Sequence, residues 1–304
     1  MARRKKGDPV HGWVFLDKPL GLGSTQAVSL VKRLFNAQKA GHAGTLDPLA
    51  TGLLAVALGE ATKTVPYMMD ADKTYAFTVK WGEATSTGDA DQFGKIVATS
   101  DVRPSLEQIE AVLPHFLGEI EQVPPAYSAI KVDGKRAYEL ARAGGEVAMQ
   151  ARLVRIDWLR LTGCPDADHA SFEVVCSKGT YVRSLGRDIA LALGTQGHLS
   201  ALRRTASGGI DVQQAVTPAI LEAAAPGQLP ALLHPVEAVL AHLPRVEVDP
   251  GRASRLAHGN PVMLLPSEAP PNGADEVLLL SSGKPLAIAM LRKGEAQPVR
   301  VFNL

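Results

Sequence analysis

Apolar and polar residues follow two different periods along the chain, and each period predicts a type of element. After Ser24, a good N-cap residue, apolar side chains recur at helical spacing up to Phe35, which predicts an amphipathic helix. From Thr74 to Trp81 the pattern has a period of two, so Tyr75 shares the apolar face of a predicted strand. By the same criteria, further helices are predicted to start at Ser105 and Thr180, and further strands to span residues 13–16, 129–132, 154–161 and 172–176.

The order of these elements predicts an α+β fold. Helices and strands are interspersed without a regular βαβ period, and the sequence contains no internal repeat. Past Pro244 the pattern changes to short apolar runs separated by Gly, Pro and Ser, which predicts a small all-β domain after a helical linker. We therefore expect a basic tail over residues 1–10, a first domain over 11–243 and the all-β domain over 244–304.

The composition is that of an ordinary folded protein. Of the 304 residues, 46% are apolar and 21% are charged, which excludes wholesale disorder. The longest apolar run, Leu53–Leu58, is far shorter than the roughly 18 residues of a membrane span, and the basic N-terminus leads into no signal-peptide-like stretch. Cys164 and Cys176 form neither a disulfide framework nor a Cys-x-x-Cys metal pair. We expect a soluble, reduced, cytoplasmic protein.

Net charge limits how the chain can bind nucleic acid. It has 32 basic and 31 acidic residues, but four basic ones (Arg3, Arg4, Lys5 and Lys6) lie in the tail, which leaves 28 against 31. A protein that coats nucleic acid without specificity carries a large positive excess. Any nucleic acid is therefore expected in a local basic cleft. The tail fits a solvated terminus at least as well as a nucleic-acid-binding arm.

Residues 41–54 form the most distinctive segment, Gly-His-Ala-Gly-Thr-Leu-Asp-Pro-Leu-Ala-Thr-Gly-Leu-Leu. Its glycines suit neither a helix nor a strand interior, so we expect an ordered loop that leads into an apolar strand. Asp47 has leucines nearby on both sides, and a carboxylate among apolar neighbours needs a cationic partner to stay ionised. Asp-Pro also commonly begins a turn, so a structural and a catalytic role both remain open for these residues.

A second segment, residues 176–183, reads Cys-Ser-Lys-Gly-Thr-Tyr-Val-Arg and runs from a strand through a glycine turn into a helix. This order is expected to expose Tyr181 and Arg183 at a sheet edge, where an arginine can pair bidentately with a carboxylate. The alternative is that Tyr181 fills the core and Arg183 is an ordinary surface charge.

Spacing argues against several other kinds of site. Residues 59–64 resemble the end of a phosphate-binding P-loop but lack its glycines at the required positions, and residues 21–23 lack the third glycine of a dinucleotide loop. The eight histidines form no His-x-x-x-His pair, and no Gly-x-Ser-x-Gly elbow occurs. We therefore expect neither a metal site nor a cofactor.

Taken together, the two segments make the chain resemble the TruB family of pseudouridine synthases, which act on position 55 of bacterial tRNA. Eight elements match in one order, and the loop around Asp47 is highly specific. They are Asp17-Lys18-Pro19, the Gly41–Gly52 loop, Gly59-Glu60-Ala61-Thr62-Lys63, Asp72-Lys73-x-Tyr75, Asp89-Ala90-Asp91, Pro125-x-Tyr127-Ser128-Ala129-x-Lys131, Ser177-Lys178-Gly179-Thr180-Tyr181-x-Arg183 and Leu202-Arg203-Arg204. Ser86 stands where an acidic residue is often found in the family.

The resemblance implies an isomerase that detaches uracil from ribose at N1–C1′, turns the base and reattaches it through C5. Neither redox chemistry nor net hydrolysis is involved, which agrees with the expectation of no cofactor. Asp47 matches the family's catalytic aspartate, and a carboxylate can both form and release a covalent adduct. The residues leave open whether it attacks C6 of the base or C1′ of the sugar.

The resemblance also assigns the side chains around the target base. Arg183 matches the arginine that pairs with the aspartate and would hold it ionised and aimed. Tyr75 matches the tyrosine that stacks on the base. Tyr181 matches a tyrosine beside the base, a candidate for removing the C5 proton, although a phenol with a pKa of about 10 is a weak base at neutral pH.

Five more residues are assigned to substrate binding by the resemblance. Leu202 matches an apolar wall of the uracil pocket. His42 matches the residue that enters the RNA loop and fills the space of the extruded nucleotide, whose unstacking costs a few kcal/mol. Lys18, Lys63 and Asp89 are expected to support the cleft.

The fold implied by the resemblance is the pseudouridine-synthase fold, a mixed, mainly antiparallel sheet flanked by helices and loops, followed by a PUA-like all-β domain. Residues from about 119 to 150 resemble the insertion that closes over the T arm of tRNA. This segment contains Lys131, Lys135, Arg136 and Arg142. The expected partner is thus the T arm of tRNA, bound by a monomer without metal or membrane.

Two alternatives to this function remain. The chain could be an RNA-binding module or tRNA-folding chaperone, or a related synthase that acts on another RNA, because the choice of target depends on surface shape. The set of Asp47, Arg183 and Tyr75 argues against a module without catalysis. A phosphate-binding NTPase is disfavoured because the chain has no P-loop.

Overall fold

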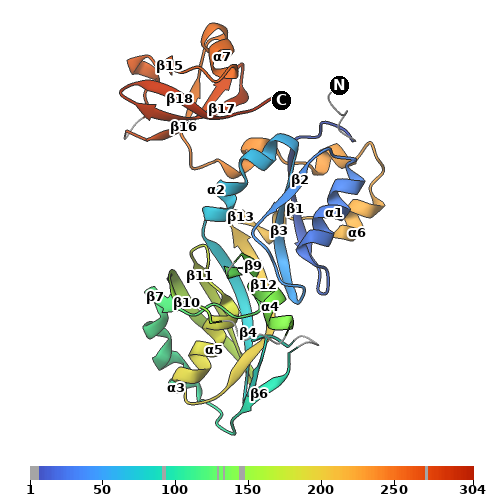
Figure 1. The fold of residues 1–304 in the computed structure, drawn as a ribbon, viewed down its shortest axis with the longest axis vertical. Coiled ribbons are helices and arrows are strands. Elements are labelled where there is room, and N and C mark those ends of the chain that lie inside the picture. The colour runs from blue at the N-terminus through green and yellow to red at the C-terminus, as the bar shows by residue number, and fades with distance from the viewer. Residues whose placement is uncertain (1–6, 91–93, 129, 133, 144–147, 271–272) are drawn as a thin grey trace.

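The computed structural model describes residues 7–90, 94–128, 130–132, 134–143, 148–270 and 273–304. Within these residues, nine strands form one sheet: β1 (Gly12–Lys18), β2 (Ala40–Ala43), β3 (Ala50–Leu58), β4 (Lys73–Trp81), β7 (Gly118–Gln122), β10 (Arg152–Asp166), β11 (His169–Cys176), β12 (Gly197–Ser207) and β13 (Ile210–Asp211). The main order is β1-β3-β12-β4-β11-β10-β7, with β2 paired to β3 and β13 to β12 (Figure 1). β3 and β12 are parallel, and the other pairings of this sheet are antiparallel. This is the mixed, mainly antiparallel sheet that the family resemblance implied.

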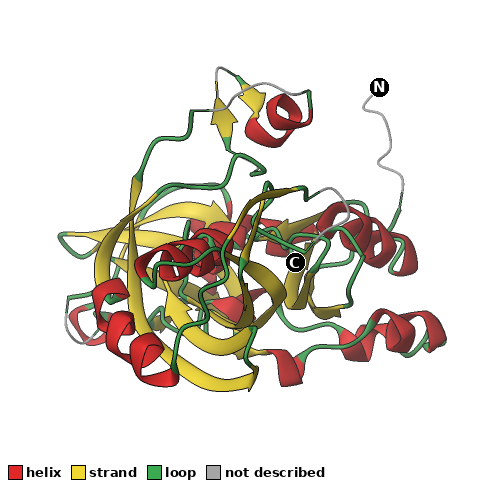
Figure 2. Ribbon diagram, turned by 90° about the horizontal axis from the view of Figure 1, so that it is seen from below, coloured by secondary structure: helices red, strands yellow, loops and turns green. Residues whose placement is uncertain are grey.

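Helices cover the two halves of this sheet separately (Figures 1 and 2). α1 (Ser24–Leu34) and α6 (Pro218–Ala223) share a hydrophobic core with β1 and β3. α3 (Leu106–Val112) and α5 (Val182–Ala192) share another core with β4, β10 and β11. The shorter helices and hairpins before residue 244 are η1 (Gly59–Lys63), α2 (Val65–Asp70), β5 (Glu83–Thr85), β6 (Ile96–Thr99), η2 (Leu113–Phe116), β8 (Lys131–Val132), β9 (Lys135–Arg136), α4 (Ala137–Arg142), η3 (Val212–Gln214), η4 (Leu229–Leu232) and η5 (Val236–Val239).

Most of the predicted elements are present, with small shifts at their ends. The alternating segment is strand β4, whose Phe77, Val79 and Trp81 are buried as the period of two required. The helix expected from Thr180 starts at Val182 instead, because the backbone N–H of Thr180 still closes the preceding turn onto Ser177. The predicted strand at 129–132 is described only as β8, since Ala129 lies outside the described residues.

The C-terminal segment forms a second sheet of five strands within the described residues. These are β14 (Arg245–Glu247), β16 (Glu276–Ser281), β17 (Lys284–Arg292), β18 (Glu295–Val301) and β15 (Val262–Met263), given in their order across the sheet. Two short helices, α7 (Pro250–Ala257) and η6 (Pro266–Glu268), were not predicted by the hydrophobic pattern. The Asp249 side chain caps α7 by accepting from two backbone N–H groups, a local signal that the search for apolar periods misses.

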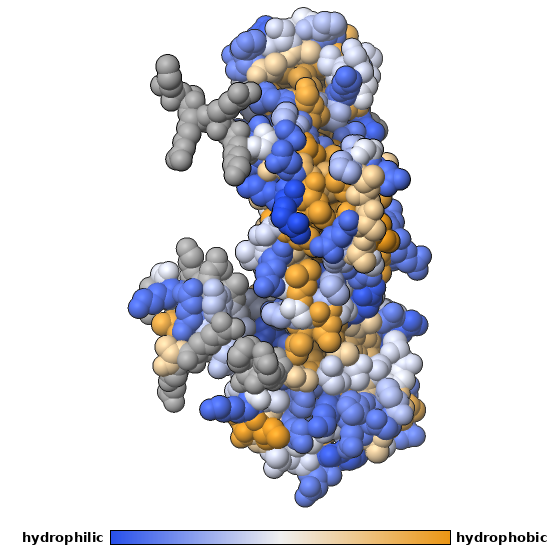
Figure 3. Space-filling view, turned by 90° about the vertical axis from the view of Figure 1, so that its right-hand side faces the viewer, coloured by the Kyte–Doolittle hydropathy of each residue, from blue (hydrophilic) through white to orange (hydrophobic). Residues whose placement is uncertain are grey.

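The C-terminal sheet shares a core with the first domain. Leu278 and Ile288 of this sheet belong to the same buried cluster as Trp13 and Met68. In the space-filling view, apolar residues run in a band down the middle of one face, with hydrophilic residues on either side (Figure 3). No helix in the described part of the chain is long and apolar enough to cross a membrane.

Candidate active site

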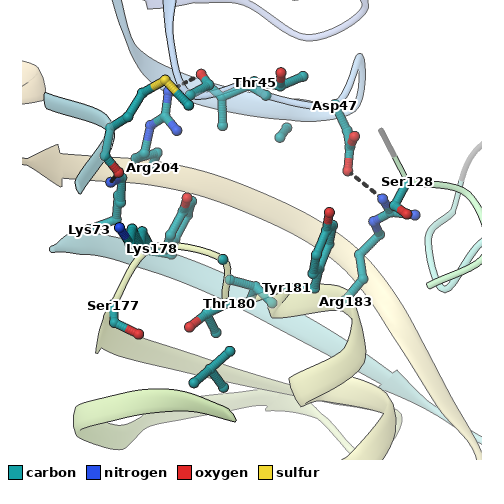
Figure 4. A pocket seen from close by; sticks show the side chains of 18 of the residues that line it. Thr45, Asp47, Lys73, Ser128, Ser177, Lys178, Thr180, Tyr181, Arg183 and Arg204 are labelled. Atoms are coloured by element: carbon teal, nitrogen blue, oxygen red, sulfur yellow. Dashed lines mark hydrogen bonds and ion pairs between the residues drawn. The ribbon is translucent and has the colours of Figure 1, made fainter. Parts of the chain in front are cut away.

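A solvent-open cleft of about 560 Å³ lies where the Asp47 loop faces the middle strands of the large sheet. The loop between β2 and β3 forms one wall, β4 and β12 form the floor, and the turn between β11 and α5 forms the opposite wall (Figure 4). The lining residues that bear on function are Asp47, Asp70, Lys73, Tyr75, Ser128, Arg152, Lys178, Tyr181, Arg183, Leu202 and Arg204. The two segments singled out in the sequence, 41–54 and 176–183, therefore meet in one cleft.

The loop that carries Asp47 is held on both sides of this residue. The Ser24 hydroxyl donates to the Leu46 carbonyl at 2.7 Å and accepts from the Leu46 N–H at 2.9 Å. Lys18 Nζ donates to the Pro48 carbonyl at 3.3 Å and to the Leu22 carbonyl at 2.7 Å. Because the residues before and after Asp47 are both bonded to buried groups, its backbone has little freedom to move.

Asp47 and Arg183 form an ion pair, with Oδ2 of the carboxylate 2.9 Å from Nη2 of the guanidinium. Arg183 is 5% exposed and also donates to the carbonyls of Thr87 at 2.7 Å and Tyr127 at 2.9 Å. The Asp47 side chain is 38% exposed and faces the cleft. The predicted pairing of Arg183 with the Asp47 carboxylate is present, but Arg183 is buried, so its expected exposure at a sheet edge and the alternative of an ordinary surface charge were both wrong. Its burial follows from the first turn of α5, which points it under the Asp47 loop.

Strand register brings Tyr75 and Leu202 to the floor of the cleft. Leu202 on β12 pairs with Phe77 on β4 and with Ala50 on β3, next to the end of the Asp47 loop. Tyr75 lies two residues before Phe77, so it is on the same face of β4. Both Tyr75 and Leu202 are partly exposed and line the cleft. An apolar side chain and an aromatic ring thus lie where a flat base could stack.

Tyr181 lies on the opposite wall beside Arg183 (Figure 4). Its backbone N–H donates to the Gln122 side chain at 2.8 Å, which fixes the turn before α5. Burial raises the pKa of the Tyr181 phenol, and the Arg183 charge only partly opposes this. The phenolate is therefore even scarcer at neutral pH than in an exposed tyrosine, although it is a stronger base once formed.

The cleft is basic although the whole chain is nearly neutral. Basic residues in its lining outnumber acidic ones by five to two. The basic ones are Lys73, Arg152, Lys178, Arg183 and Arg204, and the acidic ones are Asp47 and Asp70. On the rim, Lys178 pairs with Asp70 at 2.9 Å, and both side chains are more than half exposed. The local basic cleft that the charge count required is present.

The remaining predicted site residues lie outside the lining of this cleft. His42, on β2, is partly exposed with its Nδ1 buried, and burial together with the Arg204 charge lowers its pKa. Lys18 is fully buried behind the Asp47 loop. Lys63 pairs with Glu60 at 2.6 Å and donates to the Val301 carbonyl at 2.7 Å, where the C-terminal sheet meets η1. Asp89 is 8% exposed, and its backbone bonds to the Thr85 hydroxyl.

The insertion at 119–150 contributes β8, β9, α4 and the cleft residue Ser128. Lys135 is exposed. The side chains of Lys131, Arg136 and Arg142 and the whole of Arg3–Lys6 lie outside what the structure describes.

Sequence reasoning assigned no role to Lys73, Arg152 and Arg204, which also line the cleft. For two of them, Lys73 and Arg204, the sequence did contain a signal. Arg204 is two residues from Leu202 in a strand, and Lys73 is two residues from Tyr75, so a period of two places each pair on one face. Arg152 had no comparable signal, because it lies at the start of β10, where it pairs with Gln122 on β7, and it reaches the cleft only in the folded chain.

The architecture is shared with a solved chain from a complex entitled "Crystal Structure of a Cbf5-Nop10-Gar1 Complex". The two chains superimpose with a TM-score of 0.71 and 26% sequence identity, over 96% of this chain and 84% of that chain. Two family models match consecutive parts of the chain. Residues 32–182 match the TruB family pseudouridylate synthase (N terminal domain), and residues 183–241 match the tRNA pseudouridylate synthase B C-terminal domain.

Curated relatives are similar along the whole chain. A protein of Caulobacter sp. (strain K31) named tRNA pseudouridine synthase B is 52% identical over 311 residues, covering 100% of both chains. A Brucella ovis (strain ATCC 25840 / 63/290 / NCTC 10512) protein of the same name is 51% identical over 325 residues, covering 100% of this chain and 99% of its own. This chain therefore belongs to the TruB family of pseudouridylate synthases.

Proposed function

We propose that this chain converts uridine to pseudouridine at position 55 in the T loop of tRNA. The observation that carries the proposal is the Asp47–Arg183 ion pair of 2.9 Å in an open, basic cleft. Full-length similarity to proteins named tRNA pseudouridine synthase B supports the choice of substrate. In the reaction the N1–C1′ bond breaks and a C5–C1′ bond forms. C5 loses a proton and N1 gains one, so the product is an isomer.

Asp47 acts as the nucleophile in this proposal. Its carboxylate reaches the cleft, and its loop is held by Ser24 and Lys18, so the carboxylate is oriented before substrate arrives. Arg183 supplies the cationic partner that keeps the carboxylate ionised next to apolar neighbours. Attack at C6 of the base and attack at C1′ of the sugar both use this geometry.

The everted uracil stacks on Tyr75, with Leu202 as the apolar wall, and Tyr181 lies beside C5. The chemistry of these side chains supports the assignment, because ring stacking and apolar burial offset the few kcal/mol that flipping a nucleotide costs. His42 occupies the space left in the RNA loop. Lys18 supports the cleft indirectly, through the Asp47 loop. Lys63 and Asp89 support the cleft from outside its lining.

Phosphates of the T arm bind to the basic rim and to the insertion at 119–150. Residues 11–243 form the catalytic domain of this proposal, and residues 244–304 form a PUA-like RNA-binding domain that contains the second sheet. The protein works as a monomer in the cytoplasm and needs no metal.

The test uses unmodified tRNA transcript labelled with tritium at C5 of uridine, because each isomerisation releases that hydrogen to water. Wild-type protein is expected to release tritium, and a transcript with cytidine at position 55 is expected to release none. Asp47→Asn should abolish release yet leave tRNA binding nearly intact, which also separates catalysis from a chaperone role. Asp166→Asn, an exposed position at the end of β10, is the matched control and should change neither. Release from Asp47→Asn near the wild-type rate would refute the assignment.

A further inference from the structure

A second buried arginine, Arg204 on β12, lines the cleft without a role in the chemistry described above. It is 2% exposed. Its Nε donates to the Leu53 carbonyl at 2.7 Å, and its Nη2 donates to the Gly44 carbonyl at 3.1 Å. Figure 4 shows it beside Thr45, on the far side of the cleft from the Asp47–Arg183 pair. Arg204 thus links Gly44, at the start of the loop that carries Asp47, to strand β3, which follows the loop.

The same side chain reaches Tyr75 through the strand register. Arg204 pairs with Gly52 on β3 and with Tyr75 on β4, so the three residues form a row across three strands. Side chains of directly paired residues lie on one face of a sheet. The Arg204 guanidinium is accordingly close enough to Tyr75 that its charge opposes the rise in the pKa of the Tyr75 phenol that burial causes. One side chain therefore contacts both the loop of the nucleophile and the ring expected to stack on the base.

Two glycines of the loop fit closely around Arg204. Gly44 has a φ of +85°, and a Cβ there would lie 3.3 Å from Arg204 Nη1. Gly52 has a φ of +97°, and a Cβ there would collide with the Arg204 carbonyl oxygen. Both positions therefore require glycine. Two of the glycines that made this segment distinctive in the sequence are therefore needed because Arg204 packs directly against them.

The charge of Arg204 is not neutralised by a carboxylate. In the described part of the chain, no carboxylate lies within 4.0 Å of its guanidinium, and its backbone acceptors are neutral carbonyls. Burial, followed by the Arg204 charge, lowers the pKa of Lys73 to about 8. Burying a guanidinium without a counter-ion is unfavourable, because the charge loses its hydration. A neutral side chain would avoid this cost but would leave the Leu53 and Gly44 carbonyls without their donor, so what the arginine adds is to fix the position of these two backbone groups.

We propose that Arg204 is a positioning residue for the isomerisation: it holds the Asp47 loop and the Tyr75 ring at a fixed separation, so that a base stacked on Tyr75 meets the Asp47 carboxylate. The inference rests on the proposed function. Its effect is on the rate of the bound complex rather than on tRNA affinity, because Arg204 lies beneath the surface that the RNA contacts.

Three variants test this role in the full chain. Arg204→Met removes the charge and both side-chain hydrogen bonds at similar volume. Arg204→Lys keeps the charge, but the lysine side chain is shorter and its one ammonium group cannot reproduce the planar set of N–H donors of a guanidinium. Arg203→Met is the matched control, since Arg203 is the next residue on β12 and pairs instead with Asp17 at 2.8 Å, outside the cleft.

The measurements are the single-turnover rate at saturating tRNA, the Kd for tRNA, the melting temperature, and amide hydrogen exchange over residues 44–53. Arg204→Met is expected to slow the rate by about 100-fold with little change in Kd, because small misplacements of reacting groups cost that much. Arg204→Lys should recover part of the rate. Arg203→Met should leave the rate unchanged. Exchange over 44–53 should increase most in Arg204→Met, less in Arg204→Lys and not at all in Arg203→Met.

Three results would overturn the proposal: a near-wild-type rate in Arg204→Met, a rate loss matched by the loss of folded protein, or unchanged exchange over 44–53. If Arg204→Met does not fold, Arg204→Lys decides by the same criteria, with a wild-type rate and wild-type exchange counting against the proposal. If wild-type protein itself produces no pseudouridine, the proposed function fails. Hydrogen exchange then still decides whether Arg204 orders the loop.

Discussion

Replacing Arg183 by Met tests the buried guanidinium that pairs with Asp47. The change keeps most of the apolar volume of the side chain but removes three polar contacts. These are the ion pair to Asp47 and the hydrogen bonds to the carbonyls of Thr87 and Tyr127, all between 2.7 and 2.9 Å. The Asp47 carboxylate and two carbonyls would then lack their donor.

The expected loss of stability follows from these contacts. Each hydrogen bond from a charged donor contributes about 1.5–3 kcal/mol. Removing a buried guanidinium also relieves its desolvation, and the Asp47 side chain, at 38% exposure, can recover water. The net cost is therefore about 2–4 kcal/mol, a fall in melting temperature of about 3–6 °C for a chain of this size. Turnover should fall by about 100- to 1,000-fold, because the nucleophile loses its orientation and its cationic partner.

The assays are thermal unfolding and tritium release under single-turnover conditions. Arg187→Met, one turn later on α5, is the control, because Arg187 is 35% exposed and pairs with Asp188 rather than with Asp47. It should retain wild-type turnover. If Arg183→Met turned over within about threefold of wild type, where about 100-fold is expected from misplacement, Arg183 would not position the nucleophile.

Three further predictions concern the loop, a buried lysine and the RNA. Gly52→Ala should destabilise the protein by at least about 2 kcal/mol in urea unfolding, because its φ is +97° and a Cβ would meet the Arg204 backbone; Gly163→Ala, in open space, should cost almost nothing. Burial lowers the pKa of Lys73 to about 8 from its ordinary 10.5, so the unfolded chain binds more protons between these values. Between pH 8 and 10.5, the free energy of unfolding of the wild-type protein should therefore increase with pH more than that of Lys73→Gln. A difference between the two proteins that does not change with pH would contradict the lowered pKa. Arg152 and Lys178 lie on the cleft surface, so the logarithm of the tRNA association constant should fall against log salt with a slope of about −2 or steeper; a flat response would exclude phosphate contacts there.

The sequence was sufficient for the class of fold and the two sheets, and it singled out the loop that carries Asp47, the proposed nucleophile. Local patterns carry this information, since a period of two fixes which face of β4 is buried, and a glycine-rich loop before an apolar strand marks the segment of Asp47. The eight sequence elements that occur in the same order as in the TruB family then indicated the family and the expected roles of the site residues. The short helix α7 was missed, because its start depends on one capping side chain and not on a period.

Only the tertiary structure decided how the site is assembled. Lys63 and Asp89 matched the family pattern as well as Tyr75 did, yet they lie outside the lining of the cleft, because adjacency along the chain says nothing about which sheet edge or face a loop reaches. The burial of Arg183 and the reach of Arg204 depend on contacts between residues about 130 to 160 positions apart in the chain. A sequence pattern records which side chains are present. Their separation, their burial and the neutral or charged groups around them are set by the packing of strands that meet only in the folded protein.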